Sequence, residues 1–578
     1  MKQTKTSKKK SQKKSKGGLS SILAAGGTVL GGALLAKMAI GGVKQLRSHT
    51  DEVNKLNVFP VPDGDTGDNM RMTIESGVSA IENLETDDLA EVMTVLSHGM
   101  LLGARGNSGV ILSQFFAGTA KGLENVKEAD PDTLGKALEM GVQQAYGSVM
   151  TPTEGTILTV AREAVEYAVA HINSESTIHT FFDDLVKEMH ASLERTPEAL
   201  QALRDAGVVD SGGAGLFYIM DGFNRVLNGE EVADTSGETF APAAKKVDVT
   251  ASGFGPDSVM TYGYCTELLV QLQNSKVDIE KFDVEPLKAF LSELGDSIVA
   301  FKTDSIVKLH VHTLTPEKVL AHCRTFGEFL TVKIENMSVQ HTNLENEAET
   351  APAAPAEAKK YGVVAVTNGP GLEELFKEFG TDEIVQGGQT QNPSTNDFLD
   401  AFAKVNAEHI FAFPNNGNIL LAAQQAAELY TKAKVHVIPS KSVGTGYVAL
   451  SSMNFDAETP EEILAEAEAA MARVTAGYVS PSIRDAEMNG VKIKEGDTIG
   501  IVNKEIVVSD ADRIAAATAL AAKLLEGDKF MLTVFTGKDA NPDDSEKLQS
   551  AIAEKAPDAE IYFIEGGQEI YPYIFVAE

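Results

Sequence analysis

The sequence predicts a multidomain protein, with an all-α region first, a small α+β domain in the middle and an α/β domain last. A chain of 578 residues is too long for a single hydrophobic core. Residues 230–247 and 343–360 are rich in small and charged residues and have the composition of linkers. Apolar residues follow helical spacing before the first linker, and strands alternate with helices after the second. The predicted folded regions are therefore residues 33–229, 248–342 and 361–578.

The composition is that of a globular protein with a strong negative charge. Hydrophobic residues make up 43% of the chain and charged residues 23%, which is ordinary for a globular protein. The net charge of −33 argues against nucleic acid as a partner, because the neutralisation of phosphates needs a basic surface. The 2 cysteines do not make a disulfide framework, so we expect a reducing, cytoplasmic location.

The first 32 residues form an extension that is basic and then apolar. Eight lysines lie between Met1 and Lys16, and we expect this stretch to be disordered. The run Leu19–Ala36 is apolar, but four glycines interrupt it, and it barely reaches the ~18–20 residues that a membrane span needs. Three interpretations stay open: a solvated tail, a peripheral contact of the lysines with an anionic membrane, and a signal peptide or anchor.

Helical spacing marks the elements of the first folded region. Leu34, Met38, Val43 and Leu46 share one face of a helix, which we expect to be the first of the domain. Proline, glycine and capping residues bound the later helices. Those helices are predicted over residues 134–149, 157–171 and 197–206.

The loop at residues 57–70 has the sequence N-V-F-P-V-P-D-G-D-T-G-D-N-M. Asp63 and Asp65 are two residues apart, so in an extended segment both carboxylates point the same way. Two such carboxylates repel each other unless a cation lies between them. Oxygen ligands of this kind suit Mg²⁺, which usually also binds phosphate. The alternative is a solvated turn, since Asp and Gly are common turn residues.

Three glycine-rich loops precede later helices. In residues 103–109 the glycines around Asn107 open a helix with free amide groups, which is an anion site unless the glycines serve only close helix packing. Arg105 in the same loop either neutralises a transferring phosphoryl group or pairs with a surface acid. Thr156 and Asp210 precede two further helices, as helix caps or as nucleotide contacts. None of these loops is a Walker A sequence, so a phosphate grip would be distributed over several of them.

The loop at residues 57–70 resembles the signature of the nucleotide-binding subunit of dihydroxyacetone kinases, and it is most similar to the branch that forms the catalytic subunit of bacterial fatty acid kinase. Residues 103–109, 151–159 and 207–215 resemble that family in the same order, and residues 566–573 resemble its ending. The resemblance implies an all-α helical barrel whose rim loops carry two Mg²⁺ and the phosphates of ATP.

The resemblance also implies roles for individual residues. Asp63 and Asp65 would hold Mg²⁺ between the β- and γ-phosphates, and with Arg105 they are the expected catalytic residues. Asn57 is nearest to a third metal ligand that is Asp in dihydroxyacetone kinases, but it lies one residue further from Asp63 than in that family. The expected nucleotide-binding residues are Thr66, Gly67, Asn69, Gly106, Asn107, Ser108, Gly109, Thr156, Asp210 and Gly212.

A second metal site is expected in the middle domain. His310 and His312 alternate with apolar residues and so project from one face of a strand, and Cys265 lies on another strand. With His341 or water as a fourth ligand, they suit a structural Zn²⁺ site, and the resemblance includes a metal-carrying middle domain. The alternative is a pair of packed or exposed strand histidines, and Cys323 is expected to be buried in a helix. The strands and helices of this domain are predicted over residues 263–270, 306–312, 287–294 and 316–326.

The last region is expected to have a largely parallel sheet. Residues 368–371 and 414–418 follow strand ends, where such sheets place binding sites. This region is similar to the substrate-binding half of dihydroxyacetone kinases. However, His409 and His436 lie in predicted strands, so neither is placed to hold a ketone covalently. The region either binds a substrate or partner or serves as a scaffold. Its apolar strands are predicted over residues 363–367, 409–414, 434–439, 498–502 and 530–535.

Three functions follow as hypotheses. The first is an ATP- and Mg²⁺-dependent kinase that phosphorylates a fatty acid carboxylate presented by a separate acyl-binding protein. The second is a dihydroxyacetone (glycerone) kinase, and the third is a nucleotide-binding regulator that docks a partner through its C-terminal half. We expect a cytoplasmic homodimer, with peripheral membrane contact if the lysine-rich tail binds anionic lipid.

Overall fold

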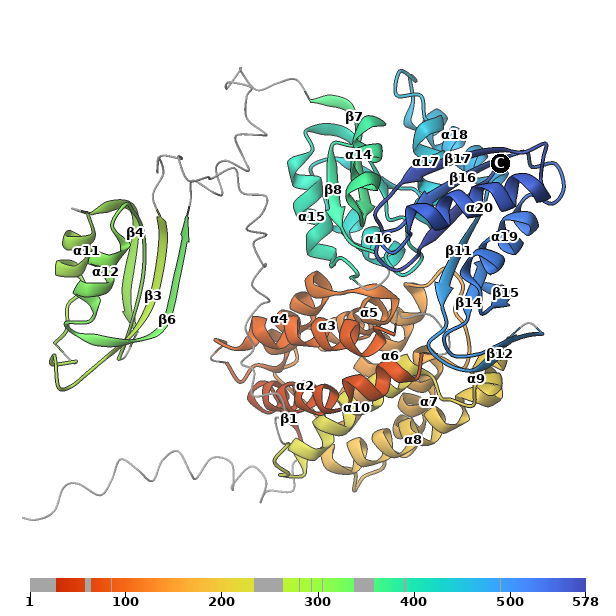
Figure 1. The fold of residues 1–578 in the computed structure, drawn as a ribbon. Coiled ribbons are helices and arrows are strands. Elements are labelled where there is room, and N and C mark those ends of the chain that lie inside the picture. Colours follow the sequence, from red (N-terminus) through yellow and green to blue (C-terminus); the bar gives the residue numbers. More distant parts are fainter. Residues whose placement is uncertain are drawn as a thin grey trace, which may run out of the picture. The chain divides into compact units, whose positions relative to one another are not determined.

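The computed structural model divides into two compact units, one made of the N-terminal and C-terminal regions and one made of the middle domain (Figure 1). The N-terminal region is helical, and the C-terminal region is α/β with a parallel sheet, which confirms these parts of the predicted fold class. The described residues are 28–57, 64–84, 86–232, 264–279, 281–292, 294–303, 305–336, 358–388, 391–488 and 490–578.

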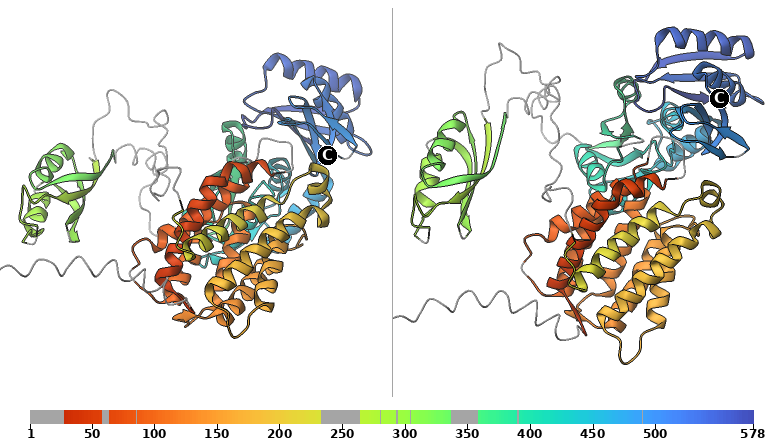
Figure 2. Two further views of the ribbon diagram at one scale, coloured as in Figure 1. Left: turned by 90° about the horizontal axis from the view of Figure 1, so that it is seen from below. Right: turned by 60° about the horizontal axis from the view of Figure 1, so that its bottom comes forward.

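The helices of the N-terminal region pack side by side in a closed ring, as both views of Figure 2 show. Each of helices α2 to α8 packs against the next, and α10 packs against both α8 and α2. Within the described residues, none of the helices is long and apolar enough to span a membrane. The helices are α2 (Gly32–Lys55), α3 (Thr66–Ile81), α4 (Leu89–Gly103), α5 (Gly106–Gly122), α6 (Pro131–Gly147), α7 (Ile157–Ala170), α8 (Ile178–Ala199), α9 (Gln201–Ala206) and α10 (Ser211–Leu227).

The ring closes through glycines where α2 and α10 meet. A Cβ atom at Gly42 would lie 2.7 Å from the Phe223 ring, and one at Gly222 would lie 2.5 Å from the Gly41 carbonyl oxygen. Side chains at these positions would therefore push the two helices apart. Apolar side chains fill the inside of the ring, and Met38, Leu46 and Met70 are fully buried there.

The packed part of the chain begins before residue 33. Strand β1 (Leu30–Gly31) pairs with β2 (Glu128–Ala129), and Leu30 is only 1% exposed. In α2 the predicted apolar face includes Met38, Val43 and Leu46 as expected, but Leu35 is buried where Leu34 was expected. Residues 1–27, which include most of the predicted basic extension, lie outside the described residues.

The helix predicted over residues 197–206 is wrong, because α8 continues through Pro197 and a separate short helix, α9, follows. Proline has no N–H to donate to the Leu193 carbonyl, and the hydroxyl of Thr196 donates to that carbonyl instead, at 2.7 Å. The side chain thus satisfies the acceptor that the proline leaves without its helical donor, and α8 ends two residues later.

The middle unit is a four-stranded antiparallel sheet of order β4-β5-β3-β6 with two helices. Its core includes Leu268, Leu291, Leu309 and Val319, and Cys323 is fully buried at the end of α12, as predicted. Strands β4 and β6 had no separate signal in the sequence analysis. The elements are β3 (Tyr264–Leu272), α11 (Glu285–Ser292), β4 (Gly295–Thr303), β5 (Ile306–Thr313), α12 (Pro316–Cys323) and β6 (Gly327–Asn336).

The first half of the C-terminal region is a parallel sheet of order β10-β9-β7-β8. The chain runs from β7 to β8 on one side and then returns to β9 on the other, so the strand order reverses between β7 and β9. Ala104 and Val110 of the helical ring belong to the same hydrophobic cluster as Val364 and Ile410 of this sheet, so the two regions share a core. The elements are β7 (Lys359–Thr367), α14 (Pro370–Glu378), β8 (Glu383–Gln386), α15 (Thr395–Lys404), β9 (Ala407–Phe413), α16 (Leu420–Leu429) and β10 (Lys434–Val437).

The second half forms a mixed six-stranded sheet of order β15-β14-β11-β18-β16-β17, which differs from the expectation of a largely parallel region. Only β16 and β17 pair in parallel within it. The cause is local, because β14 and β15 are joined by a two-residue turn that forces an antiparallel pair. The elements are α17 (Val443–Ser452), α18 (Pro460–Arg473), β11 (Thr475–Pro481), β12 (Ala486–Met488), β13 (Val491–Ile493), β14 (Thr498–Val502), β15 (Glu505–Asp510), α19 (Arg513–Leu524), β16 (Met531–Thr536), α20 (Pro542–Lys555), β17 (Glu560–Glu565) and β18 (Tyr573–Ala577).

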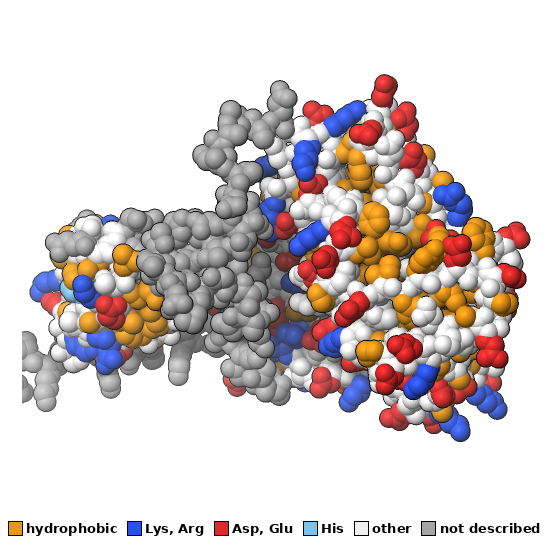
Figure 3. Space-filling model, turned by 45° about the horizontal axis from the view of Figure 1, so that its top comes forward, with side chains coloured by type: hydrophobic (Ala, Val, Ile, Leu, Met, Phe, Trp, Pro, Cys, Tyr) orange, Lys and Arg blue, Asp and Glu red, His pale blue; other side chains and the backbone are white. Residues whose placement is uncertain are grey.

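The charged surface shows no basic tract on the face drawn in Figure 3. Lysine and arginine side chains are dispersed there among acidic ones. This distribution agrees with the net charge of −33 and gives that face no electrostatic footprint for nucleic acid.

Candidate active site

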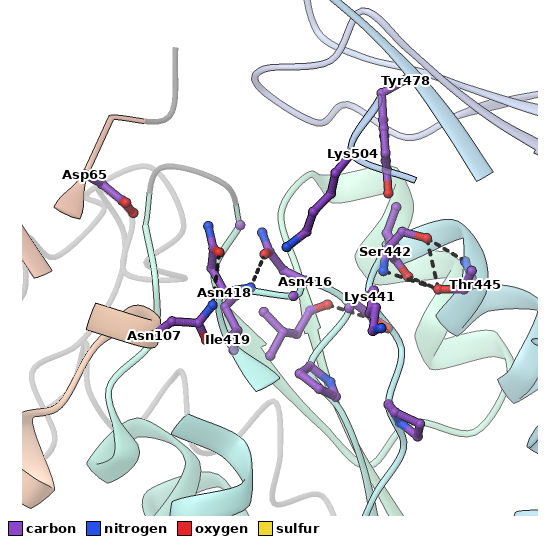
Figure 4. A pocket seen from close by; sticks show the side chains of 18 of the residues that line it. Asp65, Asn107, Asn416, Asn418, Ile419, Lys441, Ser442, Thr445, Tyr478 and Lys504 are labelled. Carbon is purple, nitrogen blue, oxygen red and sulfur yellow. Dashed lines mark hydrogen bonds between the residues drawn. The ribbon is translucent and has the colours of Figure 1, made fainter. Parts of the chain in front are cut away.

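A cavity of about 1150 Å³ lies between the rim loops of the helical ring and the loops of the α/β region (Figure 4). The helical side presents the starts of α3, α5, α7 and α10, and the α/β side presents loops that follow strands. The helical residues of the cavity wall include Asn57, Asp65, Thr66, Asn69, Asn107, Ser108, Thr156, Asp210 and Gly212, which are all among the residues predicted from the sequence.

The α/β wall of the cavity is built at the carboxyl ends of parallel strands. Thr367 and Asn368 follow β7, residues 414–418 follow β9, and Pro439 and Lys441 follow β10. Because the strand order reverses between β7 and β9, the loops after these two strands diverge and leave a crevice. The loops at residues 368 and 414–418, which the sequence placed at strand ends, thus face the predicted nucleotide loops.

Asp65 lies at the N-cap of α3, on the rim of the cavity. Its carboxylate accepts a hydrogen bond from the side-chain amide of Asn392, and its backbone carbonyl accepts one from Asn69 N–H at 2.8 Å. Asn69 is 4% exposed and also lines the cavity, so the start of α3 presents two oxygen-bearing side chains to this space. Asp63, the second member of the predicted carboxylate pair, lies outside the described residues.

The loop before α5 brings a helix N-terminus to the same rim. Gly106 adopts a φ of +59°, which a side chain disfavours, and this conformation turns the chain from Arg105 into α5. The next residue, Asn107, donates to Asn418 Oδ1 across the cavity at 3.4 Å. Asn107 Oδ1 is buried and has no hydrogen-bond partner within the described residues. This oxygen is therefore a ready acceptor, or metal ligand, on the cavity wall.

We expect Gly106→Ala to destabilise the fold more than Gly207→Ala. A Cβ atom at Gly106 would lie 2.6 Å from Asn69 Nδ2, whereas a Cβ atom at Gly207 would meet nothing within 4 Å, and both glycines have positive φ. The strained φ alone costs about 1 kcal/mol at Gly207, and the clash should add about 1–3 kcal/mol at Gly106. Urea denaturation of both variants measures the difference, and equal losses would show that Asn69 moves freely.

Asp210 caps α10 at the opposite wall of the cavity. Its carboxylate accepts the Gly213 N–H at 2.7 Å, so the sequence alternative of a helix cap is present. Burial raises the pKa of Asp210 to about 6, although hydrogen bonds from the backbone of Gly213 and Ile157 work in the opposite direction. Thr156 precedes α7 beside it, but its hydroxyl donates to the Thr153 carbonyl at 2.7 Å rather than to an amide of the helix.

Arg105 does not line the cavity in the described structure. Its guanidinium donates to the Asn392 carbonyl at 2.8 Å and lies 3.5 Å from the Asp397 carboxylate. Of the two sequence alternatives for Arg105, the geometry shows the pairing with an acid. The acid comes from the α/β region, so Arg105 joins the two regions rather than facing the cavity.

Asn392 is the residue near the site that the sequence analysis missed. It is 3% exposed, its side chain binds Asp65, and its backbone binds Arg105. The Asn392 segment lies at the start of α15, where Thr395 N–H donates to the Ala104 carbonyl at 3.2 Å. Nothing local in the sequence marks Asn392, because its partners lie nearly three hundred residues away or more.

Two glycines predicted to bind the nucleotide have packing roles instead. The N–H of Gly67 donates to Asn54 Oδ1 at 2.7 Å, and a Cβ atom there would lie 2.6 Å from the Thr50 carbonyl. A Cβ atom at Gly109 would lie 2.4 Å from Thr73 Oγ1. Neither residue lines the cavity, and both allow α3 to approach its neighbours closely. Asn57 does line it, while its carbonyl accepts from Arg484 at 2.6 Å.

The predicted zinc site in the middle unit is described only in its backbone. Cys265 pairs with His312, and Glu267 pairs with His310, in the antiparallel register of β3 and β5. The side chains of these residues and the whole of His341 lie outside what the structure describes. Among the described residues no group of three His, Cys, Asp or Glu side chains is arranged to hold a metal ion.

Three family models match the chain in succession. The DAK2 domain matches residues 60–225, the middle domain of FakA-like fatty acid kinase proteins matches residues 261–344, and their C-terminal domain matches residues 362–578. Protein YloV of Bacillus subtilis (strain 168) is 39% identical over 557 residues, which cover 95% of this chain and 99% of that protein.

Two solved structures are similar to parts of the chain. The dihydroxyacetone kinase from C. freundii, in complex with AMP-PNP and Mg²⁺, is 22% identical, covers 34% of each chain and has a TM-score of 0.28. The fatty acid kinase B3 protein of Streptococcus pneumoniae, loaded with linoleic acid, is 13% identical, covers 38% of this chain and 98% of its own, and has a TM-score of 0.27. At TM-scores this low, neither likeness bears on the chemistry of this chain.

Proposed function

Because the chain belongs to the family of FakA-like fatty acid kinase proteins, we propose that it is an ATP-dependent kinase that phosphorylates the carboxylate of a fatty acid to give an acyl phosphate. The acceptor is presented by a separate acyl-binding protein, since the family is named after one subunit of its enzyme. The observation that carries the proposal is the cavity, in which nucleotide-type rim loops face the strand-end loops of an α/β sheet.

The residues on the helical wall fit a magnesium nucleotide. The oxygen donors at this wall are the carboxylate of Asp65 and the unpartnered Oδ1 of Asn107, and Mg²⁺ prefers oxygen ligands. Asp63 is proposed as a further ligand from the sequence motif. Bound Mg²⁺ would neutralise charge on the phosphates of ATP.

The chain's own groups would position the nucleotide. The N-terminus of α5 carries amide groups and the positive end of the helix dipole, which suit phosphate oxygens beside Asn107 and Ser108. Asn69 lies beside this loop and would orient the same phosphates. Asp210 and Gly212 at the start of α10 would contact the ribose or base.

A carboxylate acceptor suits this cavity better than a hydroxyl. In the transfer, an acceptor oxygen forms a bond to the γ-phosphorus while the bond to the β,γ-bridging oxygen breaks, and ADP leaves. A carboxylate has no proton to lose, whereas a hydroxyl acceptor needs a group that takes its proton. No histidine lines the cavity among the residues that the structure describes. Dihydroxyacetone is therefore the second candidate acceptor, and nucleotide-dependent regulation without transfer is the third.

Hydroxylamine trapping tests the proposed reaction. The purified chain is incubated with Mg²⁺, ATP and oleate, with and without an acyl-binding protein from the same organism, and the acyl hydroxamate is quantified. We expect little hydroxamate without the acyl-binding protein and steady formation with it, matched by release of ADP. Rapid ADP release with dihydroxyacetone instead would favour the second candidate, and no ADP release with any acceptor would favour the regulator.

A further inference from the structure

The turn between β14 and β15 holds a lysine in a conformation that lysine rarely adopts. Asn503 and Lys504 have φ values of +50° and +68°, and they are the two residues of the hairpin between Val502 and Glu505. This geometry is a type I′ turn, whose second position strongly favours glycine. Three of the four non-glycine residues with positive φ in the described structure are asparagines, which tolerate it, so Lys504 is the exception.

The side chain of Lys504 explains its position. Figure 4 shows it extending from the turn into the cavity toward Asn416, and both residues line that space. Lys441, which follows β10, lines the same wall. Neither lysine makes an ion pair or a side-chain hydrogen bond with any residue that the structure describes. Backbone strain retained at a cavity wall, with an unpaired charge at its tip, is typical of ligand-binding positions.

Charge is segregated between the two walls of the cavity. Asp65 and Asp210 lie on the helical wall, and the two lysines lie on the α/β wall. Glu569 also lines the α/β wall, but Lys538 pairs with it at 2.9 Å, so Glu569 does not need either cavity lysine as its partner. The α/β wall therefore carries positive charge that no described carboxylate neutralises, opposite the proposed magnesium nucleotide.

We propose that Lys441 and Lys504, with Asn416 and Asn418 beside them, form an oxyanion subsite on the acceptor side of the cavity. This inference deepens the proposed function and rests on it, because it assigns the α/β wall to the group that receives or carries the phosphoryl. The ligand chemistry is that of a carboxylate or a free phosphate, which lysine binds as a compact point charge. The α/β region is thus more than a scaffold or a docking surface.

Lysine labelling tests the subsite without requiring turnover. The wild-type full-length chain is treated with a small excess of an N-hydroxysuccinimide acetyl ester, and mass spectrometry gives the acetylation rate at each lysine. Lys492 on β13 is exposed and lies outside the cavity, so it serves as the internal control. The measurement is repeated with sodium decanoate, with inorganic phosphate and with MgAMP-PNP.

We expect decanoate or phosphate to slow the labelling of Lys441 and Lys504, but not of Lys492, by about tenfold at ten times the dissociation constant, where about a tenth of the sites are free. The more effective of the two anions identifies the source of the oxyanion. Protection by MgAMP-PNP alone would overturn the assignment, because the lysines would then contact the nucleotide. Unchanged labelling with all three probes would also overturn it.

Lys504→Gly provides a second, independent reading. Glycine suits the positive φ, so this variant should melt no lower than wild type while losing the charge. Anion protection of Lys441 should then disappear, and its persistence would contradict a shared subsite. Failure of the proposed kinase reaction is distinguishable, because labelling reports anion binding whether or not acyl phosphate is formed. Acyl phosphate formation without anion protection would remove only the subsite.

Discussion

Asp65→Ala is expected to lower acyl phosphate formation by at least about 10²–10³-fold, the loss typical of deleting one preorganised electrostatic contact. Asp65 lies at the N-cap of α3 on the cavity wall, and its side chain makes no capping hydrogen bond to that helix. Removing the carboxylate should therefore remove a ligand of the metal nucleotide while the fold survives. Initial rates with saturating ATP and acyl-binding protein measure the effect, and circular dichroism checks the fold.

Asp68→Ala is the matched control for this prediction. Asp68 lies one turn further along α3, where it pairs with Arg71 at 2.8 Å and accepts from Asn54 at 2.8 Å. It does not line the cavity, so its loss should leave the rate within a few-fold of wild type. Near-normal turnover by a folded Asp65→Ala protein would remove Asp65 from the catalytic machinery.

Asn392→Leu is expected to lower kcat/KM by about 10–100-fold, the usual consequence of removing a group that orients a metal ligand. The Asn392 amide donates to the Asp65 carboxylate, and leucine keeps the bulk but not the donor. The hydrogen bond from Arg105 reaches the backbone carbonyl of Asn392, so it should survive the substitution. Asn392 is thus a positioning residue that acts through Asp65.

The Mg²⁺ dependence of the rate separates positioning from structure. If Asn392 orients Asp65, the Asn392→Leu variant should need more Mg²⁺ for half-maximal activity, with a melting temperature close to that of wild type. Asn396→Ala, in the same segment, is the control, since Asn396 is exposed and its side chain binds only Asp400, at 3.1 Å. A lower melting temperature with an unchanged Mg²⁺ requirement would give Asn392 a structural role alone.

Local patterns predicted the elements that carry the nucleotide loops. Helices α6 and α7 lie within a few residues of their predicted bounds, because an apolar stripe at helical spacing is a local property of the chain. The same holds for strands β9, β10, β14 and β16. Nine of the residues expected at the site line one cavity, since each lies at the start of a ring helix or in the loop before it.

Features that depend on distant partners were not predictable in this way. Asn392 reaches Asp65 across 327 positions of the chain, and a single asparagine after a loop carries no signal of such a partner. Arg105 offered two roles, and only the arrival of Asp397 beside it decides between them. Gly67 and Gly109 matched a binding motif, but the approach of neighbouring helices accounts for both.

The mixed sheet was missed for a different reason. Strands β11, β15, β17 and β18 are short or carry polar residues, and hairpins rather than helices connect some of them. Alternation of strands with helices predicts a parallel sheet only where the connections are long enough to cross over. The Asn503-Lys504 turn lacks the glycine that usually marks such a hairpin in a sequence, so it gave no turn signal.

A crystal structure with AMP-PNP and Mn²⁺ in place of Mg²⁺ tests the central claim most directly, because anomalous scattering locates the metal independently of the nucleotide. We predict a manganese peak about 2.1 Å from a carboxylate oxygen of Asp65, with the triphosphate against the start of α5 at Asn107 and Ser108. A nucleotide bound outside the cavity, or a metal bound to its phosphates without contact to Asp65, would contradict the account.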